Sequence, residues 1–192
     1  KSMKTFLGRK KELELLNTYD KSAKSNLIVI KGRRRIGKSR LVREFAKDKT
    51  LYRFVGLAPD KAITAQHQRN EFARKLREYF PSLPELKALD WAELFELLAT
   101  HSAKQHAILF FDEVSWMAHD DPTFLPKLKN AWDEAFSQNH KLMLILCSSI
   151  SYWIEKNILA STSFIGRINH TISLRELSLK HASELMTQGK KH

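Results

Sequence analysis

The chain has 192 residues, of which 43% are apolar and 28% are charged, so it is long enough for one well-buried domain and too apolar to be largely disordered. Its 33 Lys and Arg residues against 21 Asp and Glu give a formal net charge of +12, which favours anionic partners such as nucleotides, nucleic acid or an acidic membrane face. Because its longest apolar runs, 107–111 and 142–147, are far shorter than the roughly 20 residues of a membrane helix, we expect a cytoplasmic protein without a membrane partner.

Apolar runs suited to buried strands alternate along the chain with segments that have helical apolar spacing. This order is typical of a parallel sheet covered by helices on both faces. Glu93 follows Asp90 by three residues, a capping-box spacing that marks the start of one helix. The expected elements are, in chain order, a helix within 9–25, a strand at 26–31, a helix at 38–48, a strand at 51–57, helices at 61–80 and 90–101, a strand at 106–111, a helix at 121–138, a strand at 141–149, a helix at 152–160, a weak strand at 170–174 and the beginning of a helix at 177–188.

Cys147 is the single cysteine, so the chain by itself can form neither a disulfide framework nor a thiolate metal site. It lies inside an apolar run, which predicts a buried structural thiol. The eight histidines show no metal-ligand spacing.

A glycine-containing loop stands between the expected strand at 26–31 and the expected helix that follows. It reads Gly-Arg-Arg-Arg-Ile-Gly-Lys-Ser and matches the phosphate-loop pattern G-x-x-x-x-G-K-[ST] in full. Two glycines at this spacing let successive backbone N–H groups face one anion, and the helix adds its positive N-terminal end. Lys38 would reach the β and γ phosphates and Ser39 would hold Mg²⁺. We expect nucleotide contacts along the whole stretch Gly32, Arg33, Arg34, Arg35, Ile36, Gly37, Lys38, Ser39 and Arg40.

Arg33, Arg34 and Arg35 occupy the variable positions of this loop. Their side chains could point away from the phosphates while the backbone binds the nucleotide. One interpretation is charge complementarity to a polyphosphate, and the other is contact with DNA, RNA or an acidic face of a protein partner.

The buried strand expected at 106–111 is followed directly by Asp112 and Glu113. Ligands bind at the carboxyl ends of strands in open α/β sheets, so these carboxylates are expected beside the phosphate loop. Asp112 would bind the Mg²⁺ sphere, and Glu113 could act as general base on the attacking water. An apolar strand that ends in Asp-Glu is common, and it is the loop upstream that makes this assignment specific.

Nearly the whole chain resembles one known family, the archaeal-type P-loop ATPases of the AAA+/STAND superfamily. Four stretches carry the resemblance: an F-x-G-R-x-x-E-L box at 6–16, the phosphate loop and its helix at 32–45, the strand and acidic pair at 109–117, and a sensor strand, helix and Gly-Arg element at 147–168. The resemblance implies an α/β fold, the P-loop NTPase three-layer sandwich with a mainly parallel five-stranded sheet of the additional-strand (ASCE/AAA+) type. It also implies ATP and Mg²⁺ as cofactors, an ATPase core at 1–175 and, at 176–192, the start of a helical lid that the chain truncates.

The resemblance further implies roles for residues outside the two motifs. Gly8 and Arg9 belong to the N-terminal box, whose backbone lies near the adenine in this family. Ser149 is expected as the polar sensor of the γ-phosphate, with Ser148 beside it, although the family commonly has a Gly-Ser pair there. Arg167 resembles an arginine that acts either as a finger on a neighbouring subunit's nucleotide, which would require a homo-oligomer, or as an internal sensor.

The leading hypothesis is an ATP-dependent molecular switch or motor core that hydrolyses ATP to ADP slowly, with Lys38, Glu113, Ser149 and Arg167 acting in catalysis. Two alternatives stay open: a basic nucleic-acid-binding protein regulated by nucleotide, and a nucleotide-dependent interaction scaffold that does not hydrolyse ATP. The sequence shows no guanine-reading N-K-x-D motif, which favours adenine.

Overall fold

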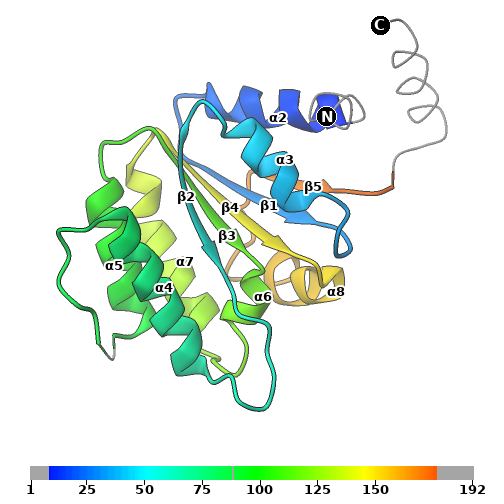
Figure 1. Ribbon diagram of the computed structural model, residues 1–192. Coiled ribbons are helices and arrows are strands. Elements are labelled where there is room, and N and C mark those ends of the chain that lie inside the picture. Colours follow the sequence, from blue (N-terminus) through cyan, green and yellow to red (C-terminus); the bar gives the residue numbers. More distant parts are fainter. Residues whose placement is uncertain (1–8, 88, 177–192) are drawn as a thin grey trace, which may run out of the picture.

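A computed structural model describes residues 9–87 and 89–176 and shows one five-stranded sheet with helices on both of its faces (Figure 1). The fold is therefore α/β, as the order of elements predicts. The elements follow one another as α2 (Lys10–Asp20), β1 (Asn26–Lys31), α3 (Lys38–Phe45), β2 (Thr50–Val55), α4 (Ala65–Tyr79), α5 (Trp91–Ser102), β3 (Ala107–Asp112), α6 (Val114–Met117), α7 (Phe124–Glu134), the 3₁₀ turn η2 (Phe136–Gln138), β4 (Leu142–Ser148), α8 (Ser151–Ile154), the π-helical turn η3 (Glu155–Leu159) and β5 (His170–Ser173).

The strand order in the sheet is β2-β3-β4-β1-β5, and all four pairings are parallel. Because parallel strands end at the same edge of a sheet, the carboxyl ends of β1, β3 and β4 lie together. The register sets Lys31 opposite Ser148 and Asp112 opposite Cys147. The residues that follow these three strands therefore share one edge, where the phosphate loop begins.

Successive strand residues belong to two different cores, because side chains along a strand alternate between faces. Leu27 and Val29 pack in the core under α4, α5 and α7, whereas Ile28 and Ile30 pack in the core under α2 and α3. Every residue of β3 and β4 is buried, as expected for central strands of a parallel sheet. Figure 1 shows the two helical layers on either side of the strands.

Three elements differ in detail from the sequence prediction. The helix expected from residue 61 begins at Ala65, because Thr64 caps it by accepting a hydrogen bond from the His67 N–H. The helix expected from 121 begins at Phe124, and the short helix α6, which was not predicted, fills part of the preceding turn. The helix expected at 152–160 is only partly α-helical and continues as η3. The helix expected at 177–188, and with it the predicted lid, lies outside the described residues.

Cys147 is completely buried, as predicted, and burial together with the nearby Asp112 carboxylate raises the pKa of its thiol.

Within the described ranges, no helix combines the length and apolarity that crossing a membrane requires.

Candidate functional site

The loop between β1 and α3 owes its shape to two glycines that act for different reasons. Gly37 has a φ of 106°, a left-handed conformation that favours glycine, and it caps the N-terminus of α3. At Gly32 a Cβ would lie 2.9 Å from both the Ile36 side chain and the Leu174 carbonyl oxygen, so no side chain fits there without movement. The loop therefore wraps tightly and delivers the chain to the start of α3. The first N–H groups of that helix have no carbonyl partner one turn earlier, which makes the position suitable for an anion.

Lys38 is a charged side chain with only 6% of its surface exposed. Its ammonium donates to the Gly32 carbonyl at 2.6 Å and to the Arg33 carbonyl at 2.7 Å. An ammonium has three N–H donors, so one donor remains after these two bonds. Lys38 thus stabilises the loop and places a buried positive charge at its centre.

Ser39 and Asp112 meet at the carboxyl edge of the sheet, as the sequence predicts from the two motifs. The Ser39 hydroxyl donates to Asp112 Oδ2 at 2.6 Å, and Asp112 is 3% exposed. Both are hard oxygen ligands, and ligands at right angles around Mg²⁺ lie about 2.9 Å apart, so this pair fits Mg²⁺ after a small adjustment. No cluster of three His, Cys, Asp or Glu suited to a metal occurs among the described residues. The donor set accordingly fits an ion that completes its shell with phosphate and water.

Glu113 follows β3 in a left-handed conformation, with a φ of 55°. Such a conformation is strained for a residue with a side chain, and it turns the carboxylate out of the strand direction. Glu113 Oε2 accepts hydrogen bonds from the Ser149 hydroxyl at 3.0 Å and the Ser149 N–H at 3.3 Å. The backbone at Gly56 packs so closely that a Cβ there would lie 2.6 Å from the Glu113 carbonyl oxygen. Glu113 is therefore fixed from two neighbouring strand ends, those of β4 and β2.

Ser148 and Ser149 have different surroundings. Ser148 is completely buried, shares a hydrogen bond of 2.8 Å with the Ser115 hydroxyl, and accepts one from the Ile150 N–H. Ser149 alone contacts Glu113. Of the two serines, Ser149 is the one whose hydroxyl joins the group of site residues, and Ser148 supports the strand end from within.

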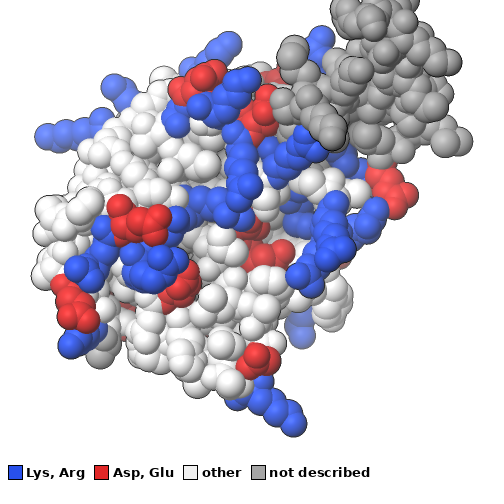
Figure 2. Space-filling model, viewed as in Figure 1, with Lys and Arg blue, Asp and Glu red and all other residues white. Residues whose placement is uncertain are grey.

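The three loop arginines are exposed, and Figure 2 shows basic side chains over the loop between β1 and α3. Arg33 forms an ion pair with Glu176 at 2.5 Å. Arg40, on the outer side of α3, is exposed as well. These arginine side chains lie at the surface around the loop, whereas Lys38 is its buried cation.

The N-terminal box reaches the loop through Arg9, which donates to the Arg175 carbonyl at 2.6 Å and to the Ile36 carbonyl at 3.4 Å. Gly8, predicted beside it, lies outside the described residues. A cavity of about 340 Å³ is lined in part by Gly32, Ile36 and Leu174, so open space adjoins the loop.

Arg167 is not brought to the loop. It precedes β5, and the Asn169 N–H just after it donates to the Leu27 carbonyl near the start of β1, so it lies at the amino edge of the sheet. Its guanidinium forms a bidentate pair with Asp133 at 2.7 and 2.9 Å and donates to the Ser163 carbonyl. This pairing lowers the pKa of Asp133.

Sequence reasoning missed two residues that contact the site, Arg53 and Gly56. The Arg53 guanidinium donates to Asp112 Oδ2 at 2.7 Å. A signal was present, because Arg53 is a charged residue in the middle of the apolar run at 51–57. Gly56 could only be recognised from its close approach to Glu113.

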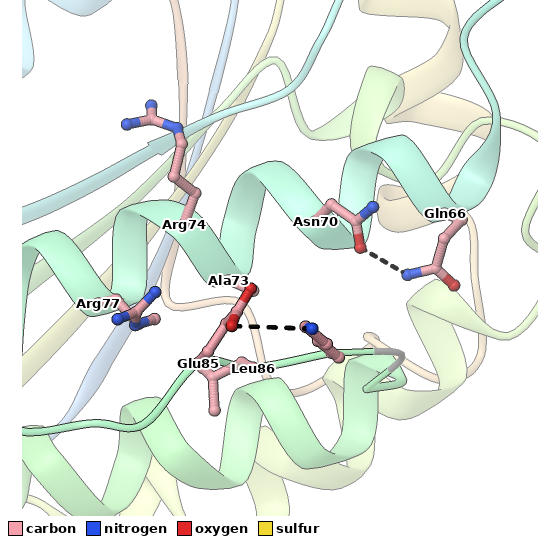
Figure 3. A pocket seen from close by; sticks show the side chains of 8 residues that line it. Gln66, Asn70, Ala73, Arg74, Arg77, Glu85 and Leu86 are labelled. Atoms are coloured by element: carbon pink, nitrogen blue, oxygen red, sulfur yellow. Dashed lines mark hydrogen bonds and ion pairs between the residues drawn. The ribbon is translucent and has the colours of Figure 1, made fainter.

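A different cavity, an open groove of about 530 Å³, lies between α4 and the segment that follows it (Figure 3). Gln66 and Asn70 of α4 bond to each other on one side, and Glu85 and Leu86 form the other side. Arg74 points away from Glu85 and Leu86 in Figure 3 and pairs with other glutamates on α4. None of the predicted site residues lines this groove.

Comparisons with known proteins concern the family and the fold of the chain. A family model described as an ATPase domain predominantly from Archaea matches residues 6–192. An uncharacterized protein of Methanocaldococcus jannaschii is 26% identical over 184 residues, which cover 96% of this chain and 39% of the relative. An uncharacterized ATP-binding protein of the same organism is 44% identical over 48 residues, 25% of this chain and 81% of that protein.

Two solved structures share the fold. The Walker-type ATPase PABY2304 of Pyrococcus abyssi matches with a TM-score of 0.65 and 20% identity, over 94% of this chain and 57% of that one. Cdc6p from Pyrobaculum aerophilum matches with a TM-score of 0.61 and 18% identity, over 93% of this chain and 48% of that one. The chain thus spans about half the length of these two structures and 39% of the first Methanocaldococcus relative.

Proposed function

The chain belongs to the family of ATPase domains found predominantly in archaea, P-loop ATPases of the AAA+ type, and we propose that it binds Mg-ATP at the loop after β1 and hydrolyses it as a molecular switch of the STAND kind. The observation that carries this proposal is the meeting of Lys38, Ser39, Asp112 and Glu113 at one sheet edge. These residues come from two separate strand ends, those of β1 and β3, and each has the chemistry that phosphoryl transfer needs.

Binding rests on the loop and the start of α3. The remaining N–H of the Lys38 ammonium and the backbone N–H groups at the start of α3 would donate to the phosphates. Ser39 and Asp112 would hold Mg²⁺, which when bound neutralises charge on the β and γ phosphates. Arg9 beside Ile36 supports an adenine position next to the loop, as the family resemblance implies.

In hydrolysis, Glu113 would have a role separate from nucleotide binding. Its carboxylate would accept a proton from water as the water oxygen bonds to the γ-phosphorus and the bond to the bridging oxygen breaks, giving ADP and phosphate. The two donors from Ser149 orient one oxygen of Glu113 and link it to the end of β4. Through this contact with Glu113, Ser149 would sense whether the γ-phosphate is present.

Lys38→Ala tests binding. Loss of a charge-assisted hydrogen bond of about 1.5–3 kcal/mol should weaken ATP affinity by roughly 10- to 150-fold in a calorimetric titration with Mg²⁺. Titrations with GTP and without Mg²⁺ test the base and the metal. Unchanged ATP affinity in Lys38→Ala would remove the proposal.

Glu113→Gln separates hydrolysis from binding. The amide keeps the shape but cannot take a proton, so phosphate release should fall on the order of 100- to 10,000-fold while ATP affinity is retained. Wild-type protein that binds ATP and releases no phosphate would favour the nonhydrolysing scaffold instead.

A second candidate function, nucleic-acid binding regulated by nucleotide, is favoured by the exposure of Arg33 and Arg34 beside the loop. Reversing both charges should abolish salt-sensitive binding of duplex DNA, whereas Arg77→Glu, an exposed arginine on α4, should have little effect. Absence of DNA or RNA binding at physiological salt, with and without ATP, would eliminate this candidate.

Arg167 lies at the amino edge of the sheet, away from the phosphate loop of its own chain. This position favours contact with the nucleotide of a neighbouring subunit over contact with the nucleotide bound to the same chain. We accordingly propose a homo-oligomer in which Arg167 leaves Asp133 to act as an arginine finger. Sedimentation with ATP should show assembly, and Arg167→Ala should lower hydrolysis without weakening ATP binding. A protein that stays monomeric with ATP and hydrolyses it at the wild-type rate after this substitution would refute the finger role.

A further inference from the structure

Arg53 on β2 contacts the same carboxylate oxygen that the Ser39 hydroxyl contacts. Its guanidinium donates to Asp112 Oδ2 at 2.7 Å, while the Ser39 hydroxyl lies 2.6 Å from that oxygen. The Asp112 side chain is only 5% exposed and that of Arg53 is 25% exposed. A cation therefore stands next to the carboxylate that would hold the metal.

The backbone N–H and C=O of Arg53 both form hydrogen bonds with one side chain, that of Tyr79. The Tyr79 hydroxyl of α4 accepts a hydrogen bond from the Arg53 N–H at 2.9 Å and lies 3.2 Å from the Arg53 carbonyl oxygen. Since β2 is an edge strand of the described sheet, this contact also covers polar groups that no other described strand pairs. Phe110, the register partner of Arg53 on β3, lies beneath the guanidinium, 5.8 Å from ring centroid to Cζ. The guanidinium is thus positioned by the fold toward the carboxyl edge.

The Arg53 guanidinium also has a hydrogen-bond donor without an acceptor. Its Nε–H is buried and has no hydrogen-bond partner among the described residues. A buried donor without an acceptor is unfavourable, and native structures rarely keep one without a reason. Next to a carboxylate suited to Mg²⁺, the missing acceptor is best supplied by an oxygen of the bound ligand.

We propose that Arg53 recognises the terminal phosphate of ATP and sets the preference of the site for ATP over ADP. This inference rests on the proposed function. Ser39 and Asp112 would hold the ion that accompanies the phosphates, and Arg53 already contacts Asp112. The terminal phosphate presents planar pairs of charged oxygens that match the guanidinium fork, and ADP lacks that group. In the absence of nucleotide, Arg53 balances the charge of Asp112.

The test compares the affinities of a non-hydrolysable ATP analogue and of ADP, by calorimetry with Mg²⁺, in the wild type and in Arg53→Ala. The variant should lose about 10- to 100-fold in affinity for the ATP analogue and less than about threefold for ADP. Arg53→Lys keeps the charge without the fork, so it should recover only part of the loss.

Arg69→Ala is a matched control. Arg69 also forms a partly buried ion pair, with Asp121 at 2.9 Å, but neither residue contacts the site residues in the described structure. This control should leave both affinities unchanged. If Arg53→Ala does not fold, as judged by circular dichroism, Arg53→Gln replaces it, because it retains a hydrogen-bond donor and loses the charge.

The outcomes separate this inference from the proposed function. Equal losses for both nucleotides, no loss, or tighter binding of the ATP analogue in Arg53→Ala would overturn the role of Arg53 and leave nucleotide binding intact. A wild-type protein that binds neither nucleotide would overturn the proposed function itself, and the inference with it.

Discussion

Gly56, the residue after β2, offers a direct test of how Glu113 is held. Its N–H donates to the Asp112 carbonyl at 3.0 Å. A Cβ at this position would lie 2.6 Å from the Glu113 carbonyl oxygen and 2.8 Å from the Trp116 Cβ, whereas ordinary contacts begin at 3.4 Å. In Gly56→Ala the neighbouring backbone must therefore move by about 0.8 Å to relieve the closest contact.

This displacement should affect hydrolysis more than binding. Overpacking of this kind costs about 1–3 kcal/mol, which lowers Tm by roughly 2–12 °C for a domain of this size. A catalytic group misplaced by close to 1 Å can lose on the order of 100-fold in rate, and Glu113 is the group that would move. Lys38 and its loop carbonyls do not touch Gly56, so ATP affinity should change less than about threefold.

Thermal unfolding, phosphate release and ATP titration of Gly56→Ala measure the three effects. The control is Leu98→Ala on α5, a fully buried residue whose truncation costs about 2–5 kcal/mol and leaves Glu113 in place. Leu98→Ala should lower Tm and retain hydrolysis per folded molecule. A Gly56→Ala protein with the wild-type Tm and hydrolysis rate would refute the reasoning.

Three further predictions concern stability and reactivity. Asp90→Ala removes the N-cap of α5, where Asp90 accepts from the Glu93 N–H at 3.1 Å, and should cost about 0.5–2 kcal/mol in urea unfolding; no change would contradict the cap. Asp133→Asn should lower Tm at pH 7. Because Arg167 lowers the pKa of Asp133 in the folded state, the stability from this pair is present above the unfolded pKa of about 3.9 and is lost as pH falls through the lower folded pKa. The Tm difference between variant and wild type should therefore shrink in acid, and a difference that persists there would speak against the pair. Burial raises the pKa of Cys147, so the native thiol should resist alkylation at pH 8 and react at once in urea; rapid labelling of the native protein would show that the thiol is accessible.

Local patterns in the sequence were enough to identify most elements and to predict that the glycine loop and the acidic pair share one edge of the sheet. The apolar runs became β1, β3 and β4 because a buried parallel strand needs a continuous apolar sequence. The phosphate-loop spacing placed Lys38 at the start of a helix, and the acidic pair at the end of β3 placed Asp112 beside Ser39. Each motif depends on neighbours in the chain, which a sequence displays directly, and their meeting follows from the general rule that parallel strands end at one edge of a sheet.

Contacts between distant segments required the tertiary structure. Arg53 and Asp112 are 59 residues apart, and only the pairing of β2 with β3 brings the guanidinium to the carboxylate. The order of strands likewise brings Ser149 to Glu113 and leaves Arg167 at the opposite edge. A strand's sequence determines that it is buried, but not which strands lie beside it or in what register, because many pairings bury the same apolar surface equally well. The sequence by itself thus determined the phosphate loop and its acidic partners, while strand order and register decided which further side chains reach them.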